Sequence, residues 1–289
     1  MDDGAIIRVR RHGNPAGPRL ILSHGNGLAI DAYYSFWNLL RDRYDLVVLD
    51  VRNHGENPPH GGSGHDMPHF VSDLENVLTE VQREFGAKPL AGVFHSLSGL
   101  IAIRHALQYP HRWGALVLFD PPIYPRDGHP LRDAQQSDKD SLSARARRRT
   151  ERYKSPGDFA KQLASRAAFK AWRPEAYALM ARATLRPDES VGDWILACPR
   201  ELEARVFEEN RDPSLWMKLA DLKAPVKLIG ADPNVEGAGP PALICKAIGE
   251  ELPIEYEAIP GTTHFLQMEK PEECVRAMET FLAKHGLAT

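Results

Sequence analysis

The sequence has few cysteines, no long apolar run and no strong excess of either charge. Only three of its 289 residues are cysteines, far apart and in no Cys-x-x-Cys or Cys/His pattern of metal-binding spacing: Cys198, Cys245 and Cys274. We therefore expect buried free thiols in a reducing, cytoplasmic location. No apolar run is long enough to span a bilayer. The amino-terminal Met-Asp-Asp-Gly lacks the basic and apolar stretches of a signal peptide, so we expect no membrane association.

Charge is nearly balanced, with 36 basic and 39 acidic side chains and a formal net charge of −3. This balance favours neither a nucleic-acid surface nor a membrane surface. The arginine cluster within residues 145–149 is typical of a solvated helix face. His60, His65 and His69 share a glycine-rich loop, but no carboxylate or cysteine completes a ligand set, so we expect no metal. The expected partner is a small-molecule substrate, and the oligomeric state, monomer or homodimer, is open.

Short apolar runs alternate with segments of helical apolar spacing along most of the chain. The predicted strands are residues 5–10, 19–23, 46–49, 90–94, 115–119, 224–229 and 254–259. The predicted helices are residues 32–44, 67–85, 97–109 and 271–282. Such alternation is typical of the α/β class, in which helices cover both faces of a mostly parallel, twisted sheet. Ligands then bind at the carboxyl ends of the strands.

The composition changes between residues 123 and 221. Strand-like runs vanish, residues 135–154 are polar and charged, and helical stretches with aromatic side chains follow. We predict that residues 123–221 are a helical insertion that caps the carboxyl edge of the sheet. Residues 1–122 and 222–289 then form the core. The aromatic side chains are expected to fill the interior of the cap, with one or two of them lining a pocket.

A sharp turn between the fourth predicted strand and its helix is the strongest candidate for chemistry. The strand ends at Phe94 and the helix begins at Leu97, so His95 and Ser96 leave no room for a loop. A turn this tight lifts the Ser96 side chain out of the backbone, as in the nucleophile elbow usually written G-x-S-x-G. Phe94 stands where that pattern has a small residue, which makes the motif degenerate.

Two other interpretations of this turn are open. Serine is favoured at helix amino termini, so Ser96 could simply be the N-cap of the following helix. Ser98 is a rival nucleophile, but it would lie inside the helix with bulky Leu100 two residues on.

Ser96, Asp232 and His264 each follow a predicted strand at the same edge of the sheet, and they occur in the chain order expected of this elbow's fold. A serine hydroxyl needs a base to take its proton, which His264 can do before protonating the leaving group. Asp232 would hold the imidazole tautomer and stabilise the imidazolium. The backbone amides of Leu97 and Asn26, the latter in a glycine loop after the second strand, could stabilise the tetrahedral intermediate.

Five segments at the ends of predicted strands belong together: Ser23-His24-Gly25-Asn26-Gly27, Asp50–Gly55, His95-Ser96-Leu97-Ser98-Gly99, Gly230-Ala231-Asp232 and Gly261-Thr262-Thr263-His264-Phe265. With them the chain resembles the α/β-hydrolase superfamily over nearly its whole length, and Arg52-Asn53-His54-Gly55 is similar to a piece of some small esterases. The resemblance implies Ser96, Asp232 and His264 as a catalytic triad, Asn26 and Leu97 as oxyanion donors, and no cofactor. Asp232 lies one residue closer to Gly230 than in many relatives, so Asp120 or Glu236 could be the acid instead.

The function that this resemblance implies is hydrolysis of a small carboxylic ester through an acyl-enzyme. A lactone or carbon–carbon bond hydrolase would use the same triad. A non-catalytic protein that binds a small ligand under the cap is the alternative from another class, and Phe94 crowding the turn is the one feature that favours it.

Overall fold

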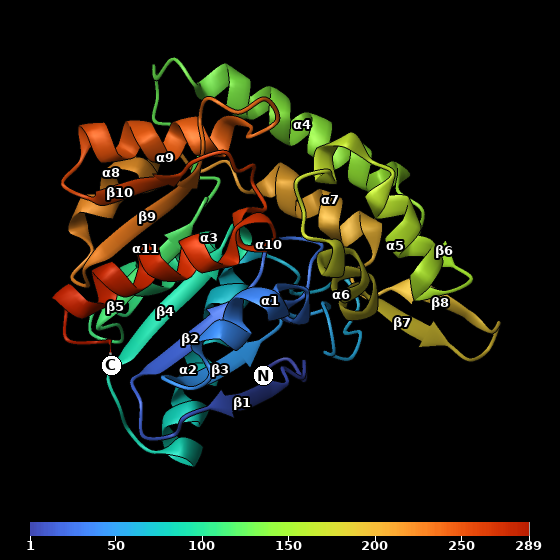
Figure 1. Cartoon of the computed structure of the whole chain (residues 1–289), viewed down its shortest axis with the longest axis horizontal. Helices are drawn as coiled ribbons and strands as arrows, with labels where there is room; N and C mark the ends of the chain where they lie inside the picture. Colours follow the sequence, from blue (N-terminus) through green and yellow to red (C-terminus); the bar gives the residue numbers. More distant parts are fainter. Residues whose placement is uncertain (289) are drawn as a thin grey trace.

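The computed structural model describes residues 1–288, and its centre is a seven-stranded sheet in the order β1-β3-β2-β4-β5-β9-β10 (Figure 1). The strands are β1 (Val9–Gly13), β2 (Arg19–Ser23), β3 (Asp45–Leu49), β4 (Leu90–His95), β5 (Ala115–Phe119), β9 (Val226–Ala231) and β10 (Glu255–Ile259). The β1–β3 pair is antiparallel and the other neighbouring strands run parallel. The α/β class and the mostly parallel sheet are therefore confirmed.

Helices cover both faces of the sheet, which is why its central strands are apolar on both sides. One face packs on α2 (Met67–Phe85), α3 (Leu97–Gln108) and α9 (Pro240–Glu251). The other packs on α1 (Tyr34–Trp37), α10 (Leu266–Glu269) and α11 (Pro271–Lys284). None of the helices within residues 1–288 is long and apolar enough to cross a membrane.

Two helical regions differ from the sequence prediction. The helix expected at residues 32–44 is three short turns, a 3-10 helix η1 (Ile30–Tyr33), α1 and a second 3-10 helix η2 (Asn38–Leu40). Buried aromatic side chains dominate these turns, and the Trp37 indole donates to the carbonyl of Ile30, so tertiary packing determines their geometry. Helix α9 was not predicted, although it begins with two prolines at its first turn, Pro240 and Pro241, where proline is tolerated.

The segment between β5 and β9 holds α4 (Arg132–Arg148), α5 (Pro156–Ala164), η3 (Ala167–Phe169), α6 (Pro174–Thr184), α7 (Arg200–Glu209), α8 (Ser214–Lys218) and η4 (Leu219–Asp221). It also holds a small antiparallel sheet of β6 (Arg152–Tyr153), β8 (Asp193–Leu196) and β7 (Leu185–Asp188). The prediction that strands vanish here is wrong at this hairpin. Its strands are only half-buried and carry polar residues such as Asp188 and Asp193, so they lack the apolar run that marks a core strand.

The inserted segment lies over the loops that follow three core strands (Figure 1). Asn26, after β2, donates its side-chain amide to the carbonyl of Glu203 on α7 at 2.8 Å. Arg205, also on α7, donates to the carbonyl of Gly62 at 2.6 Å, and the amide of Arg173 donates to Met268 after β10 at 3.1 Å. The arginine cluster at the end of α4 pairs with α7, because Arg147 bonds the Glu201 and Glu208 carboxylates. Charge pairing thus links α4 to α7 within the insertion.

Candidate active site

The turn at Ser96 has the strained geometry that its sequence predicts. Ser96 adopts φ 53° and ψ −115°, a region that residues other than glycine rarely occupy, and strain of this kind is concentrated at functional sites. Its side chain makes no capping bond to helix α3, so the N-cap interpretation does not describe it. The rival Ser98 is buried in the first turn of the helix, where its hydroxyl donates to the carbonyl of His95 at 2.9 Å.

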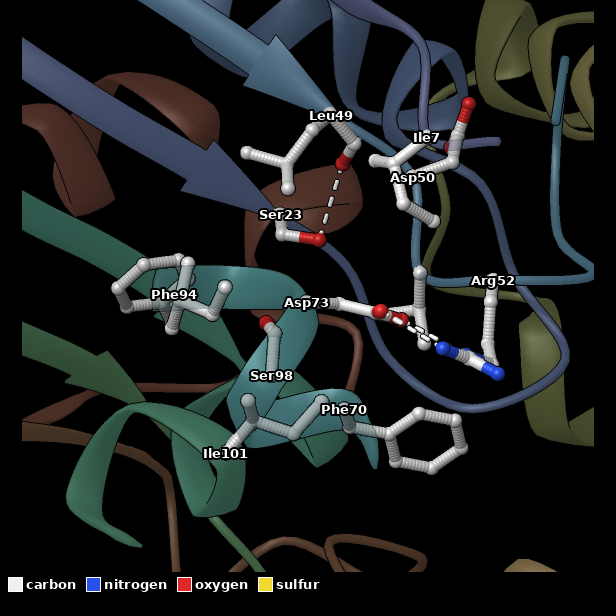
Figure 2. A pocket seen from close by; sticks show the side chains of 12 residues that line it. Ile7, Ser23, Leu49, Asp50, Arg52, Phe70, Asp73, Phe94, Ser98 and Ile101 are labelled. Atoms are coloured by element: carbon white, nitrogen blue, oxygen red, sulfur yellow. Dashed lines mark hydrogen bonds and ion pairs between the residues drawn. The ribbon is translucent and has the colours of Figure 1, made fainter. Parts of the chain in front are cut away.

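Phe94 does not crowd the serine, because its side chain lies on the opposite face of β4 from His95. Its ring packs edge-to-face on Trp113, with centroids 5.6 Å apart, beneath α3. The room for this ring comes from Gly92, where an added Cβ would lie 2.5 Å from it. Phe94 lines a cavity behind the turn together with Ser98 and Ile101 (Figure 2). The volume of this cavity is about 30 Å³, and neither Ser96 nor His264 lines it. The cavity has room for about one water molecule.

His264 joins the serine to a carboxylate. Its Nε2 lies 3.1 Å from Ser96 Oγ, and its Nδ1 lies 2.6 Å from Asp120 Oδ2. A carboxylate accepts hydrogen bonds only, so Nδ1 carries the hydrogen and Nε2 accepts from the hydroxyl. Asp120 is fully buried, and the amide of Ala231 donates to its other oxygen at 3.2 Å. Like Ser96, Asp120 is held in the left-handed region, at φ 44°.

The expectation that Asp232 meets His264 requires correction. One Asp232 oxygen accepts the amide of Gly261 at 2.8 Å and the other accepts the amide of Asn234 at 2.9 Å. These amides lower the pKa of Asp232, which lies at the surface and ties the loops after β9 and β10 together. The third candidate, Glu236, is exposed. Of the three acids, the structure brings only Asp120 to the histidine.

The glycine loop after β2 approaches the turn closely. A Cβ on Gly25 would lie 3.1 Å from both Ser96 Cβ and His95 Nδ1, so a larger residue would crowd both side chains. The amide of Gly25 donates to the Tyr33 hydroxyl at 3.2 Å, and the amide of Gly27 donates to His54 Nε2 at 3.1 Å. Within residues 1–288, the amide of Asn26 between them has no hydrogen-bond acceptor.

The amide of Leu97 is free in the same sense, because no acceptor for it lies within residues 1–288. The predicted pair of donors thus consists of two unpaired amides on segments that meet at Ser96. The side chain of Asn26 has a separate task, since it anchors the loop to α7. The carboxylate of Glu203 on that helix is paired with Arg149 at 2.5 Å.

Two buried histidines support this loop from below. His54 donates its Nδ1 hydrogen to the carbonyl of Arg52, which leaves Nε2 free to accept from Gly27. The ring of His65 stacks on the ring of His54 with centroids 5.7 Å apart, and His65 Nδ1 accepts a hydrogen bond from the side-chain amide of Asn53. Burial lowers the pKa of His54 well below its usual value and lowers the pKa of His65 to about 3. Of the three histidines in the glycine-rich loop, His65 is therefore a buried structural support together with His54.

These histidines make stability depend on pH below neutrality. Because the pKa of His65 is lower in the folded chain, the unfolded chain binds one more proton as pH falls from 6.5 toward 3, so stability is lost over that window. We expect this residue to account for about 2 kcal/mol of the unfolding free energy lost between pH 7 and pH 5. His65→Asn keeps an acceptor for Asn53 and removes the titration, so its urea-unfolding curve should change less over this range.

The matched control is His111→Asn, because His111 is an exposed histidine. Its unfolding free energy should follow that of the wild type at each pH. Equal acid sensitivity of the His65 variant and the wild type would show that His65 is not the source.

Sequence reasoning missed two residues of this neighbourhood. Tyr33 is fully buried, and its hydroxyl lies 2.6 Å from Nδ1 of His95. His95 was seen only as the residue before the serine, yet its Nε2 lies 2.8 Å from the carbonyl of His264. The one available signal was two aromatic or imidazole side chains in segments that end near the same sheet edge, which is too common a pattern to single them out.

A strained serine after the central strand of this sheet, with a histidine after the last strand, is the arrangement of an α/β hydrolase. The model of the alpha/beta hydrolase family matches residues 20–277, and the chain belongs to that family. It is 27% identical over 130 residues to YugF, an uncharacterized hydrolase of Bacillus subtilis, covering 44% of this chain and 45% of that protein. It is 28% identical over 111 residues to the pimeloyl-(acyl-carrier protein) methyl ester esterase of Aeromonas hydrophila, covering 38% and 40%. The matched stretch is thus less than half the length of either protein.

Solved structures are similar over a greater length. The structure of E-2-(acetamidomethylene)succinate hydrolase superposes with a TM-score of 0.78 at 20% identity, covering 98% of this chain and 97% of that one. A thermophilic esterase from Thermogutta terrifontis gives a TM-score of 0.70 at 21% identity, covering 97% and 94%. At these identities the likeness shows the fold.

Proposed function

We propose that this chain is a serine hydrolase that cleaves a small carboxylic ester through an acyl-enzyme, with Ser96, His264 and Asp120 as its triad. The observation that carries the proposal is the unbroken path of two hydrogen bonds from the Asp120 carboxylate through His264 to the Ser96 hydroxyl. Ester hydrolysis is the chemistry named for the Aeromonas relative. Lactone hydrolysis and carbon–carbon cleavage would use the same groups.

The geometry supports a two-step acyl transfer. Ser96 Oγ attacks the ester carbonyl carbon while its proton passes to His264 Nε2. The buried Asp120 carboxylate stabilises the imidazolium through Nδ1. The carbonyl oxygen becomes negatively charged and accepts hydrogen bonds from the free backbone amides of Asn26 and Leu97. His264 then gives its proton to the leaving alkoxide, and the alcohol departs. In the second step a water molecule gives a proton to His264 and attacks the acyl-enzyme, and the acid is released as Ser96 regains its proton.

We assign the inserted segment, residues 123–221, the role of a cap over this site, with residues 1–122 and 222–289 as the hydrolase core. It contacts the residue after His264 through aromatic side chains. Phe169 and Trp172 pack on Phe265, the residue after His264, with centroid distances of 5.4 and 5.0 Å. The inserted segment therefore packs directly on the residue that follows the proposed base.

The binding-protein alternative loses the feature that favoured it. Phe94 points away from Ser96 into the core, so the serine is not obstructed from below. The supporting observations therefore favour an enzyme.

A fluorophosphonate serine probe tests the proposal. We expect stoichiometric labelling that mass spectrometry locates at Ser96, lost in Ser96→Ala and in His264→Ala, and unchanged in Ser98→Ala. The wild type should also hydrolyse p-nitrophenyl acetate. Folded wild-type protein that is neither labelled nor active would overturn the proposal, as would labelling that ignores His264.

A further inference from the structure

His95 sits between the two loops that the proposed chemistry must hold together. It is fully buried, directly precedes Ser96, and lies with its ring centroid 4.7 Å from that of His264. Both of its ring nitrogens have partners from other strands' loops. Nδ1 lies 2.6 Å from the Tyr33 hydroxyl, and Nε2 lies 2.8 Å from the backbone carbonyl of His264.

These contacts fix the direction of each hydrogen bond. A carbonyl oxygen only accepts, so Nε2 of His95 carries the hydrogen and Nδ1 accepts from the Tyr33 hydroxyl. The same hydroxyl oxygen accepts from the amide of Gly25 at 3.2 Å. The result is a continuous path of three hydrogen bonds, in which Gly25 donates to Tyr33, Tyr33 donates to His95, and His95 donates to His264.

Each hydrogen bond of this path keeps the same donor and acceptor during the proposed reaction. Burial and the neighbouring charge of His264 lower the pKa of His95 well below its usual value. His95 therefore stays neutral when His264 takes the serine proton. A second cation at His95 would repel the imidazolium, so its neutrality is a condition for its place beside the base.

The path joins elements that the sheet keeps apart. Gly25 follows β2, whereas His264 follows β10, and β4, β5 and β9 lie between these strands. The residue after Gly25 is the proposed oxyanion donor Asn26, and the residue after His95 is the nucleophile. A shift of one loop relative to the other would move the donor away from the oxygen it must bind, and a displacement of about 1 Å can cost about 100-fold in rate.

We propose that His95 and Tyr33 act as one positioning unit that holds the oxyanion loop and the His264 loop in register around Ser96. This inference rests on the proposed function. The unit touches neither the substrate nor the transferred proton. Its loss should therefore lower kcat by misaligning the transition state and leave KM nearly unchanged.

The test compares kcat and KM for p-nitrophenyl acetate in Tyr33→Phe, His95→Phe and the double variant. We expect each single variant to lose about 10- to 100-fold in kcat, with KM within about twofold of the wild type. The double variant should be no slower than His95→Phe, because both changes cut the same path. His95→Gln should recover part of the loss, since its side-chain amide can still donate to the carbonyl of His264.

The matched control is His105→Phe, which removes another fully buried histidine with two partners. His105 bonds Glu75 and Trp113 on the far side of α3, so its loss should lower stability and leave kcat unchanged. Unchanged kcat in Tyr33→Phe and His95→Phe would overturn the inference, as would losses that add in the double variant. If the wild type shows no hydrolysis and no labelling at Ser96, the proposed function fails and the inference with it. A labelled, active wild type with an equally active Tyr33→Phe refutes the positioning unit alone.

Discussion

Asp120→Asn is expected to lower kcat/KM for p-nitrophenyl acetate by about 10⁴-fold, whereas Asp232→Asn should change it by less than about threefold. Both substitutions exchange a carboxylate for an amide of the same shape. The two variants therefore separate the role of charge and tautomer at each site from that of packing. The sequence alone favours Asp232 as the acid that pairs with His264, whereas the structure favours Asp120. The two variants therefore also decide between these two acids.

The reason for the large loss lies in how Asp120 is held. The amide of Ala231 donates to Oδ1, so an asparagine would keep its carbonyl oxygen there and turn its NH₂ toward His264. That NH₂ can only donate, which forces Nδ1 of His264 to accept and places the hydrogen on Nε2. The imidazole could then no longer take the serine proton, and the imidazolium would lose its counter-charge.

Asp232→Asn should not affect His264 in this way, because the Asp232 oxygens accept hydrogen bonds from the backbone amides of Gly261 and Asn234. An asparagine keeps one acceptor and loses the other, so a modest fall in stability with normal kinetics is expected for the folded protein. Circular dichroism and urea unfolding of both variants provide the control for folding. A folded Asp232→Asn with activity as low as Asp120→Asn would contradict the proposal that Asp120 is the acid of the triad.

Much of the architecture could be predicted because the central strands are short apolar runs and most of them alternate with helical segments. The strands β2 and β5 and the helix α2 have the predicted bounds, and the remaining core strands shift by only a few residues. A buried parallel strand leaves this signature whatever its neighbours are. The placement of Ser96 between β4 and α3 followed from the same signal, because a strand and a helix with two residues between them permit only a sharp turn.

The choice of acid could not be predicted because it depends on the register between strands. Phe119 of β5 pairs with Ile229 of β9, which places Asp120 beside Gly230, and Asp232 two residues further along. Asp120 is therefore buried at the end of β5, whereas Asp232 lies beyond the end of β9 and bonds the loop after β10. Both are strand-end carboxylates in the sequence, and nothing local to either one encodes this offset. The contact between Tyr33 and His95, 62 positions apart, is hidden for the same reason.

The hairpin of the inserted segment was missed on different grounds. β8 pairs with β6 on one side and with β7 on the other, and β7 and β8 carry Pro187, Asp188 and Asp193. Proline and aspartate are depleted in strands, so intrinsic preference argues against this assignment. Packing of Trp194 and Leu196 against the neighbouring apolar cluster overrides that preference.

Phe94→Ala, which restores the small residue usual before a nucleophile elbow, is expected to lower the unfolding free energy by about 3–5 kcal/mol. Phe94 is fully buried on Trp113, and the space behind the turn already holds a cavity of about 30 Å³ (Figure 2). Removing the ring would enlarge this void among rigid neighbours. Because the ring faces away from Ser96, labelling of the folded variant by the fluorophosphonate should remain within about threefold of the wild type.

Gly92 supplies the matched partner for this substitution. Gly92→Ala should destabilise the wild type, because the new Cβ would lie 2.5 Å from the Phe94 ring and 2.7 Å from Leu116 Cδ2. It should cost less in the Phe94→Ala background, where only the contact with the end of the Leu116 side chain is left. Urea unfolding of the two single variants and the double variant gives the coupling directly, and we expect it to exceed about 1 kcal/mol. Phe94→Ala that is as stable as the wild type and labels faster would instead mean that the ring strains the turn. Phe94 would then hinder the serine. In the structure, by contrast, the Phe94 ring fills the space that the missing side chain of Gly92 leaves on the far side of the turn.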